Sequence, residues 1–129
     1  MIRTRKRRTP LTIRPRYDNL MPLWGKAVRL KYGMTCLRCG RQAPQWKIDA
    51  AHILSRGAHP RLKYVVENGI PLCFLCHRFY DENKDSSRKW VQTVIGKARW
   101  NRLLVREKTA GKLDKAAVKV DLQQQIAEM

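Results

Sequence analysis

The stretch ENGIPLCFLCHRF, residues 67–79, decides the fold that we expect. It holds the pair Cys73 and Cys76, with His77 directly after the second cysteine and Asn68 upstream of the first. Two thiolates in a Cys-x-x-Cys pair grip one face of a metal ion. The residues that follow the pair have a helical pattern. We therefore predict a helix whose first turn is pinned by metal.

A second pair, Cys36 and Cys39, lies upstream, and Gly40 permits the tight turn that such a knuckle needs. Two pairs complete a tetrahedron around Zn²⁺, and a site of four cysteines leaves no position open for substrate. We expect a structural zinc site that contributes directly to folding free energy. Two disulfides or an iron–sulfur cluster are the alternatives. The spacing and the lack of a secretion signal favour metal in a reducing compartment.

The charge of the chain indicates its class of partner. Its 129 residues carry a formal net charge of +18, with 43% hydrophobic residues. This composition suits one domain with a modest core, and the excess charge favours nucleic acid as partner. An anionic membrane competes, but we find no apolar run that spans a bilayer and no signal peptide. We expect a cytoplasmic protein without a membrane partner.

The chain divides into three parts by composition. Residues 1–17 are basic and interrupted by Pro10 and Pro15, which predicts a flexible arm along phosphates or a solvated tail. Residues 18–110 form the expected domain with its flanking helices. Residues 111–129 form a C-terminal helix or tail, which packs on the body, contacts a partner or frays.

Hydrophobic periodicity and turn residues predict the elements between these limits. In chain order they are a helix over 18–33, a strand over 46–53, a second strand near 64–66 or 69–72, the metal-pinned helix, and helices from 85 to 96, from 97 to 108 and after 111. The core-facing positions expected on the first helix are Leu23, Ala27 and Leu30, with Trp24 and Val28 beside them. Those expected on the last helix are Leu113, Ala117, Val120 and Gln124.

The histidines concentrate near the cysteine pairs, since residues 49–60, DAAHILSRGAHP, hold two of the three. A plain zinc ribbon does not need them, but a phosphodiesterase does. It requires a base that takes a proton from water and a divalent ion that neutralises the phosphate and the leaving oxygen. A neutral imidazole such as His52 suits the base at pH 7, and carboxylate, imidazole and carboxamide groups suit the ion.

The order Cys-x-x-Cys, then AHI, then N-x-x-x-L-C-x-x-C-H, over residues 35–80, resembles the HNH or His-metal finger nucleases. SRGAHPRLKY and, more weakly, KWVQTVIGKARWNRL are similar to phage recombination endonucleases of the NinG (Rap) type. The resemblance implies an α+β chain with a ββα-metal core, braced by the four-cysteine zinc site. It implies Mg²⁺ or Mn²⁺ as the catalytic ion, with other divalent transition metals accepted, and products with 5′-phosphate and 3′-hydroxyl ends.

The same resemblance assigns roles to three residues. His52 corresponds to the general base and His77 to a ligand of the catalytic ion. Asn68 either orients the strand and loop around His52 or helps to hold the ion. From the residues alone, the alternatives are a core histidine at His52, a helix cap at His77, and a turn pair at Asn68 and Gly69.

One position departs from the family pattern, because Ala51 stands where many members place a metal ligand. The nearest carboxylate is Asp49, which NinG-like chains match with a metal-competent residue. On a regular strand Asp49 and His52 point to opposite faces, so Asp49 is a ligand only if a bulge or strand end rotates it. Otherwise Asp49 is a strand-edge carboxylate, and His59 or waters complete the metal shell.

Basic residues near the expected site are phosphate clamps or solvated loop charges: Arg56, Arg61 and Lys63. The sequence and this resemblance thus favour a phage-encoded, metal-dependent DNA endonuclease of low sequence specificity. The NinG resemblance adds branched or nicked DNA as a candidate substrate, and the sequence itself leaves the substrate structure open. The alternatives are a non-catalytic zinc-ribbon protein that binds nucleic acid and a ribosome-associated structural protein. Oligomeric state and nicking versus double-strand cleavage stay open.

Overall fold

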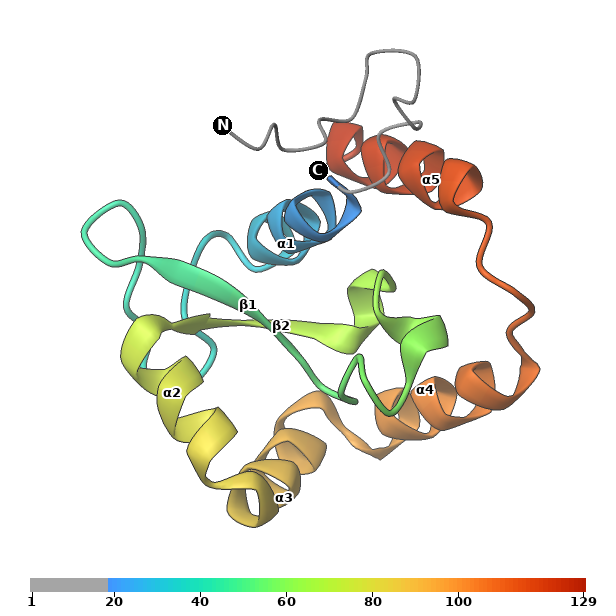
Figure 1. The fold of residues 1–129 in the computed structure, drawn as a ribbon. Helices are drawn as coiled ribbons and strands as arrows, with labels where there is room; N and C mark the ends of the chain where they lie inside the picture. The colour runs from blue at the N-terminus through green and yellow to red at the C-terminus, as the bar shows by residue number, and fades with distance from the viewer. Residues whose placement is uncertain (1–18) are drawn as a thin grey trace, which may run out of the picture.

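The computed structural model describes residues 19–129, and the basic arm expected over 1–17 lies outside this range. The chain is α+β, with five α-helices and a two-stranded antiparallel sheet in the described part (Figure 1). The helices are α1 (Leu20–Lys31), α2 (Phe74–Glu82), α3 (Lys84–Ile95), α4 (Lys97–Thr109) and α5 (Lys115–Ala127). Over residues 19–129, none of them is both long and apolar enough to cross a bilayer.

The sheet is a hairpin of β1 (Ile48–His52) and β2 (Gly69–Cys73), so the second of the two expected positions for the later strand is confirmed. The strands pair residue for residue, with His52 opposite Gly69. The connection between them contains two short 3₁₀ helices, at Pro60–Leu62 and Val66–Asn68. Helix α2 begins directly after β2, as the sequence predicts.

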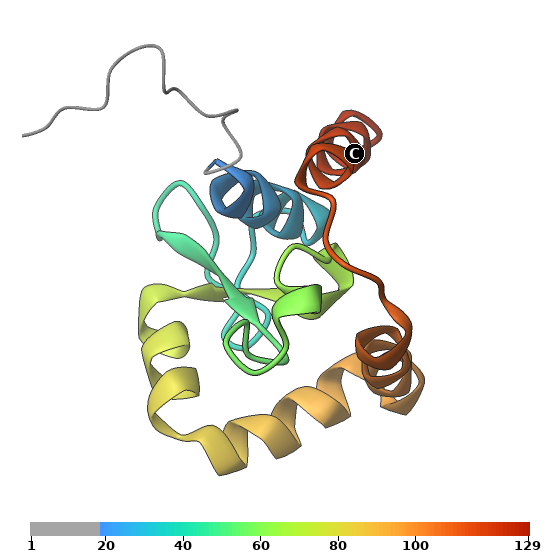
Figure 2. The same ribbon diagram turned by 45° about the vertical axis from the view of Figure 1, so that its right-hand side comes forward.

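Helices surround the hairpin on two sides. Helix α1 packs against both strands, and α2, α3 and α4 follow one another around the other side (Figures 1 and 2). One core cluster joins the hairpin to α3 and α4 through residues such as Leu72, Val91 and Leu103. A second joins α1 to α5 through Trp24 and Leu122. The C-terminal helix is therefore part of the folded body.

The faces expected on the first and last helices need correction. Helix α1 buries Leu20, Trp24, Gly25, Ala27 and Val28, whereas Leu30 is exposed. The reason is that α1 lies between the hairpin and α5, and its buried face follows both contacts.

On α5 the buried residue is Leu122, with Val118 and Ile126 one turn to either side, whereas Val120 is 62% exposed. The expected face begins at Leu113, which lies before the helix. Asp114 is the actual N-cap, because its side chain accepts hydrogen bonds from the backbone N–H groups of Ala116 and Ala117.

Candidate metal centre and adjoining cleft

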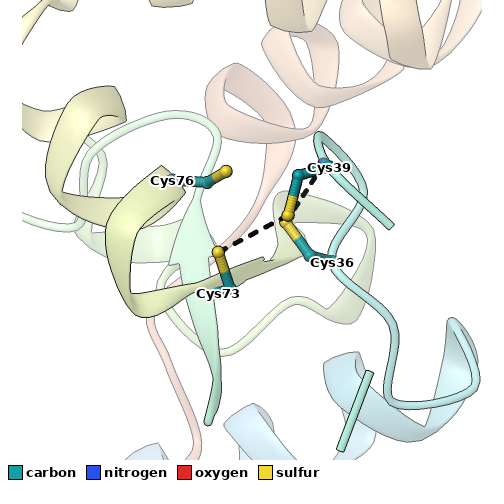
Figure 3. A group of neighbouring side chains, drawn as sticks. All are labelled: Cys36, Cys39, Cys73 and Cys76. Carbon is teal, nitrogen blue, oxygen red and sulfur yellow. Dashed lines mark hydrogen bonds between the residues drawn. The ribbon is translucent and has the colours of Figure 1, made fainter. Parts of the chain in front are cut away.

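The four cysteines converge from separate segments of the chain (Figure 3). Cys36 and Cys39 come from the loop after α1, Cys73 ends β2, and Cys76 lies in the first turn of α2. Their sulfur atoms all lie within 4.8 Å of one another, and those of Cys39 and Cys73 are 3.6 Å apart. Sulfurs of a tetrahedral zinc site lie about 3.8 Å apart, given Zn–S bonds of about 2.3 Å. None of the four forms a disulfide in the structure, so the cluster fits a structural zinc ion better than two disulfides.

Local backbone structure shapes the first knuckle. Thr35 and Gln42 form an isolated antiparallel bridge that closes the loop. Within it Gly40 has φ = 81°, a conformation that favours glycine, and its N–H donates to the carbonyl of Cys36. The N–H of Cys39 points at the sulfur of Cys36, at 3.5 Å. The turn therefore presents both thiols on the same side.

Two arginines balance the negative charge that such a cluster carries. Arg38 donates to the sulfur of Cys76 at 3.8 Å, and Arg41 to the sulfurs of Cys39 and Cys73 at 3.8 and 3.9 Å. Burial alone would raise the pKa of Cys73, but hydrogen bonds from Cys76, Arg41 and Cys39 lower it to about 6. Burial and the bond with Cys73 raise the pKa of Cys76 to about 12. A cation at the centre of the cluster would favour the thiolate form of all four cysteines.

A cleft of about 1110 Å³ lies beside β1, between α1 and the α2–α3 segment. All three histidines of the chain line it, together with Asp49. Its lining includes residues of β1 but none of β2, so the cleft follows the edge of β1 that is not paired. The residues that the sequence groups by spacing thus share one cavity.

His77 is held between two carboxylates. Its Nδ1 lies 3.2 Å from Oδ2 of Asp49 on β1, and its Nε2 lies 3.5 Å from Oδ2 of Asp81. Asp81 is absent from the residues expected at the site. It lies one helical turn after His77 on α2, and this spacing is the signal that would have identified it.

His52 stacks on the indole of Trp24, with ring centroids 4.0 Å apart and planes 10° from parallel. Its Nε2 lies 2.9 Å from the carbonyl oxygen of Lys63. Because a carbonyl only accepts, Nε2 carries the hydrogen and Nδ1 keeps its lone pair. Burial lowers the pKa of His52, with Arg56 and His77 acting in the same direction and the bond to Lys63 opposing them. His52 is therefore a neutral imidazole at pH 7.

Asn68 is fully buried and bonds to the backbone after His52. Its side-chain oxygen accepts from the N–H of Leu54 at 2.8 Å. Its amide donates to the carbonyls of Leu54 and Leu62 at 3.0 and 3.2 Å. Two roles were expected for Asn68, orientation of the loop around His52 and binding of the ion. This geometry fits the first, because the side-chain oxygen already accepts a hydrogen bond from Leu54.

Asp49 and His52 do not need the bulge that the sequence suggests. The register of β1 is regular, and the two side chains point to opposite faces as strand alternation requires. His52 contacts Trp24 of α1, and Asp49 contacts His77 of α2. Both still line the cleft, because it follows the edge of the strand and takes in side chains from either face.

The other residues expected to contact metal or phosphate do not all lie in the cleft. His59 lines the cleft, but its Nδ1 faces Oε1 of Glu107 at 3.7 Å. Arg61 donates to the carbonyl of Ala110, away from the cleft. The basic side chains that line the cleft are Arg29, Arg56, Lys84 and Arg88. Of the three expected phosphate clamps, only Arg56 is therefore in place, and the other cations come from α1 and α3.

No protein-family model, no curated protein and no solved structure matches this chain. The resemblance to HNH nucleases thus stays a prediction, and a function has to be argued from the residues of the cysteine cluster and the cleft.

Proposed function

We propose that the protein is a metal-dependent DNA endonuclease of the HNH type, with its catalytic centre in the cleft beside β1. The observation that carries this proposal is that His52 lines the same cleft as the contacting pair Asp49 and His77. The cleft brings together a neutral imidazole and a carboxylate–imidazole pair. These are the groups that a metal-assisted phosphodiesterase needs.

The separation of Asp49 and His77 suits a shared ion. Neighbouring ligands of an octahedral ion lie about 3.0 Å apart when its bonds are about 2.1 Å long, and Oδ2 of Asp49 lies 3.2 Å from Nδ1 of His77. Oxygen and nitrogen ligands together suit Mn²⁺ and Mg²⁺. Asp81 would then accept from Nε2–H and fix the tautomer of His77, as carboxylates commonly do for metal-binding histidines.

The chemistry follows from these assignments. Asp49 and His77 would hold a divalent ion, which would supply positive charge against the phosphate and the departing 3′ oxygen. Nδ1 of His52 takes a proton from water while the water oxygen bonds to phosphorus and the bond from phosphorus to the 3′ oxygen breaks. The departing 3′ oxygen takes a proton from solvent water, and the protonated His52 returns its proton to solvent, which leaves a 3′-hydroxyl and a 5′-phosphate. The stack on Trp24 and the bond to Lys63 hold the ring of His52 in one orientation.

The charge of the cleft supports a polyanionic substrate. Among residues 19–129, four cations reach it from three segments, and the whole chain carries +18. Guanidinium groups pair well with phosphate oxygens, and none of these contacts selects a base. Low sequence specificity is the expected result. The four-cysteine cluster sits at the junction of β2 and α2, where it would brace the helix that carries His77.

The test is a cleavage panel with Mg²⁺, Mn²⁺ and other divalent ions on linear, nicked and branched DNA. The wild type should cut, and His52→Ala should lose cutting while it keeps zinc, folding and DNA binding. His59→Ala is the matched control, since His59 lines the same cleft but faces Glu107, and it should keep most of the activity.

The rival function is that of a non-catalytic zinc-ribbon protein that binds nucleic acid. It predicts the same zinc content and the same salt-sensitive binding. Binding without cleavage in every combination of metal and substrate would favour this rival. Co-sedimentation with ribosomal subunits, together with inertness toward free DNA, would favour a ribosome-associated role.

A further inference from the structure

The exposed aromatic side chains of residues 19–129 gather around the cysteine cluster. They are Trp46, Phe74 and Phe79, which are 44%, 57% and 40% exposed, and Leu75 beside them is 50% exposed. Phe74 and Leu75 lie between Cys73 and Cys76 in the chain, so they sit at the rim of the cluster. Aromatic rings left in solvent in such a group usually mark a contact surface.

Two arginines connect two of these rings, those of Trp46 and Phe79, to the cysteine cluster. The guanidinium of Arg41 lies 4.4 Å from the ring centre of Trp46 and 3.9 Å from the sulfur of Cys73. That of Arg38 lies 4.1 Å from the ring centre of Phe79 and 3.8 Å from the sulfur of Cys76. We call this group, made of Arg38, Arg41, Trp46, Phe74, Leu75 and Phe79, the aromatic–arginine surface.

We propose that the aromatic–arginine surface binds unpaired nucleotides by stacking their bases on its exposed rings. Single-strand binding surfaces combine positive charge, which tracks the backbone, with aromatic side chains and arginines, which stack on bases. This surface contains two cations and no acidic residue, in a chain whose 28 basic residues outnumber 10 acidic ones. A polyanion with accessible flat faces complements it, and unpaired bases have such faces whereas stacked bases of a duplex do not.

The surface is separate from the cleft. None of its six residues lines the cleft, although α2 carries Phe74 and Phe79 as well as His77. A strand bound there would therefore lie outside the cleft, beside the helix that carries His77. The binding does not depend on cleavage, so it holds for a nuclease and for a non-catalytic binder alike.

The test compares a single strand of about 20 thymidines with an abasic strand of equal length and charge. Full-length, zinc-loaded protein is titrated into each by fluorescence anisotropy, without added Mg²⁺ or Mn²⁺. The wild type should bind the thymidine strand about tenfold more tightly than the abasic strand. Phe74→Ala should remove most of that difference and leave abasic binding within about twofold. Trp46→Ala is the second variant, with the same expected result.

Val105→Ala is the matched control, because Val105 is 58% exposed on α4, outside the surface, and its loss should change neither affinity. Zinc content is measured for every variant. Equal affinity of the wild type for the two strands would overturn the proposal. The proposal would also be overturned if Phe74→Ala and Trp46→Ala kept their zinc and lost the same affinity for both strands. These outcomes leave the cleavage panel unaffected, so the two proposals fail independently.

Discussion

Nδ1 of His77 lies 3.2 Å from Oδ2 of Asp49, although one residue belongs to α2 and the other to β1. The contact exists because α2 starts at the end of β2 and packs against both strands. It is central to the proposed chemistry, since two elements that meet in one cleft would each supply a ligand atom to the proposed ion. His52, three positions along β1 from Asp49, lines the same cleft from the other face of the strand.

The first prediction separates a direct metal ligand from its supporting carboxylate. Asp49→Asn removes an anionic ligand and should weaken Mn²⁺ binding about 100-fold. Asp81→Asn removes only the partner of Nε2 and should weaken it about tenfold. Both are measured by calorimetric titration of Mn²⁺ into zinc-loaded protein. Equal, small effects of the two variants would show that Asp49 is not a ligand.

A second prediction concerns the packing beneath His52. A Cβ at Gly69 would clash with Cγ2 of Val28 and would lie 2.7 Å from Cζ2 of Trp24. Gly69→Ala should therefore displace the indole on which His52 stacks and lower the free energy of unfolding by about 1–3 kcal/mol. Gly57→Ala is the control, since nothing lies within 4 Å of the added atom. Similar denaturation curves for the two variants would contradict the close packing described here.

The third prediction concerns zinc. Cys73→Ser leaves three thiolates, and the protein should lose most of its metal by elemental analysis. Its melting temperature should fall by about 10 °C or more, which corresponds to roughly 3 kcal/mol in a chain of this size. His77→Ala should keep full zinc content, because His77 lies outside the cysteine cluster. Zinc retained by Cys73→Ser, or lost by His77→Ala, would refute the assignment.

A fourth prediction follows from the lowered pKa of His52, which burial causes. In the unfolded chain this imidazole takes up a proton near pH 6.5, whereas in the folded protein it does so only at lower pH. The stability that it contributes is therefore present above pH 6.5 and is lost as pH falls through the folded pKa. Denaturation of wild type and His52→Asn between about pH 5 and 7.5 checks this. The wild type should lose more stability on acidification, and parallel curves would contradict it.

Local sequence patterns were enough to predict most of the helices and strands that the structure contains. The hairpin, α2, the end of α3 at Gly96 and the start of α4 follow from strand composition, a cysteine pair and a glycine with φ = 89°. The faces of α1 and α5 were predicted poorly for a physical reason. Each helix buries the side that its neighbour covers, and the α1–α5 contact joins residues from opposite ends of the described chain. Periodicity alone does not reveal which apolar row meets a partner.

In the candidate site too, local motifs predict some residues, whereas long-range contacts bring in the others. The cysteine cluster and the histidines of the cleft belong to short motifs, so spacing predicts them. The residues that support His52 do not belong to its motif, so spacing does not predict them. Trp24 comes from α1 and Gly69 from the opposite strand. Asp49 was ambiguous since strand alternation places it on the other face from His52. Only the path of the cleft along the strand edge brings both to one cavity.

Anomalous diffraction from crystals soaked in Mn²⁺ is the most direct test of the central claim, that Asp49 and His77 bind an ion beside His52. We expect a manganese peak about 2.2 Å from a carboxylate oxygen of Asp49 and from Nδ1 of His77, besides a zinc peak among the four cysteines. A zinc peak with no manganese in the cleft, at Mn²⁺ concentrations that support cleavage, would contradict it.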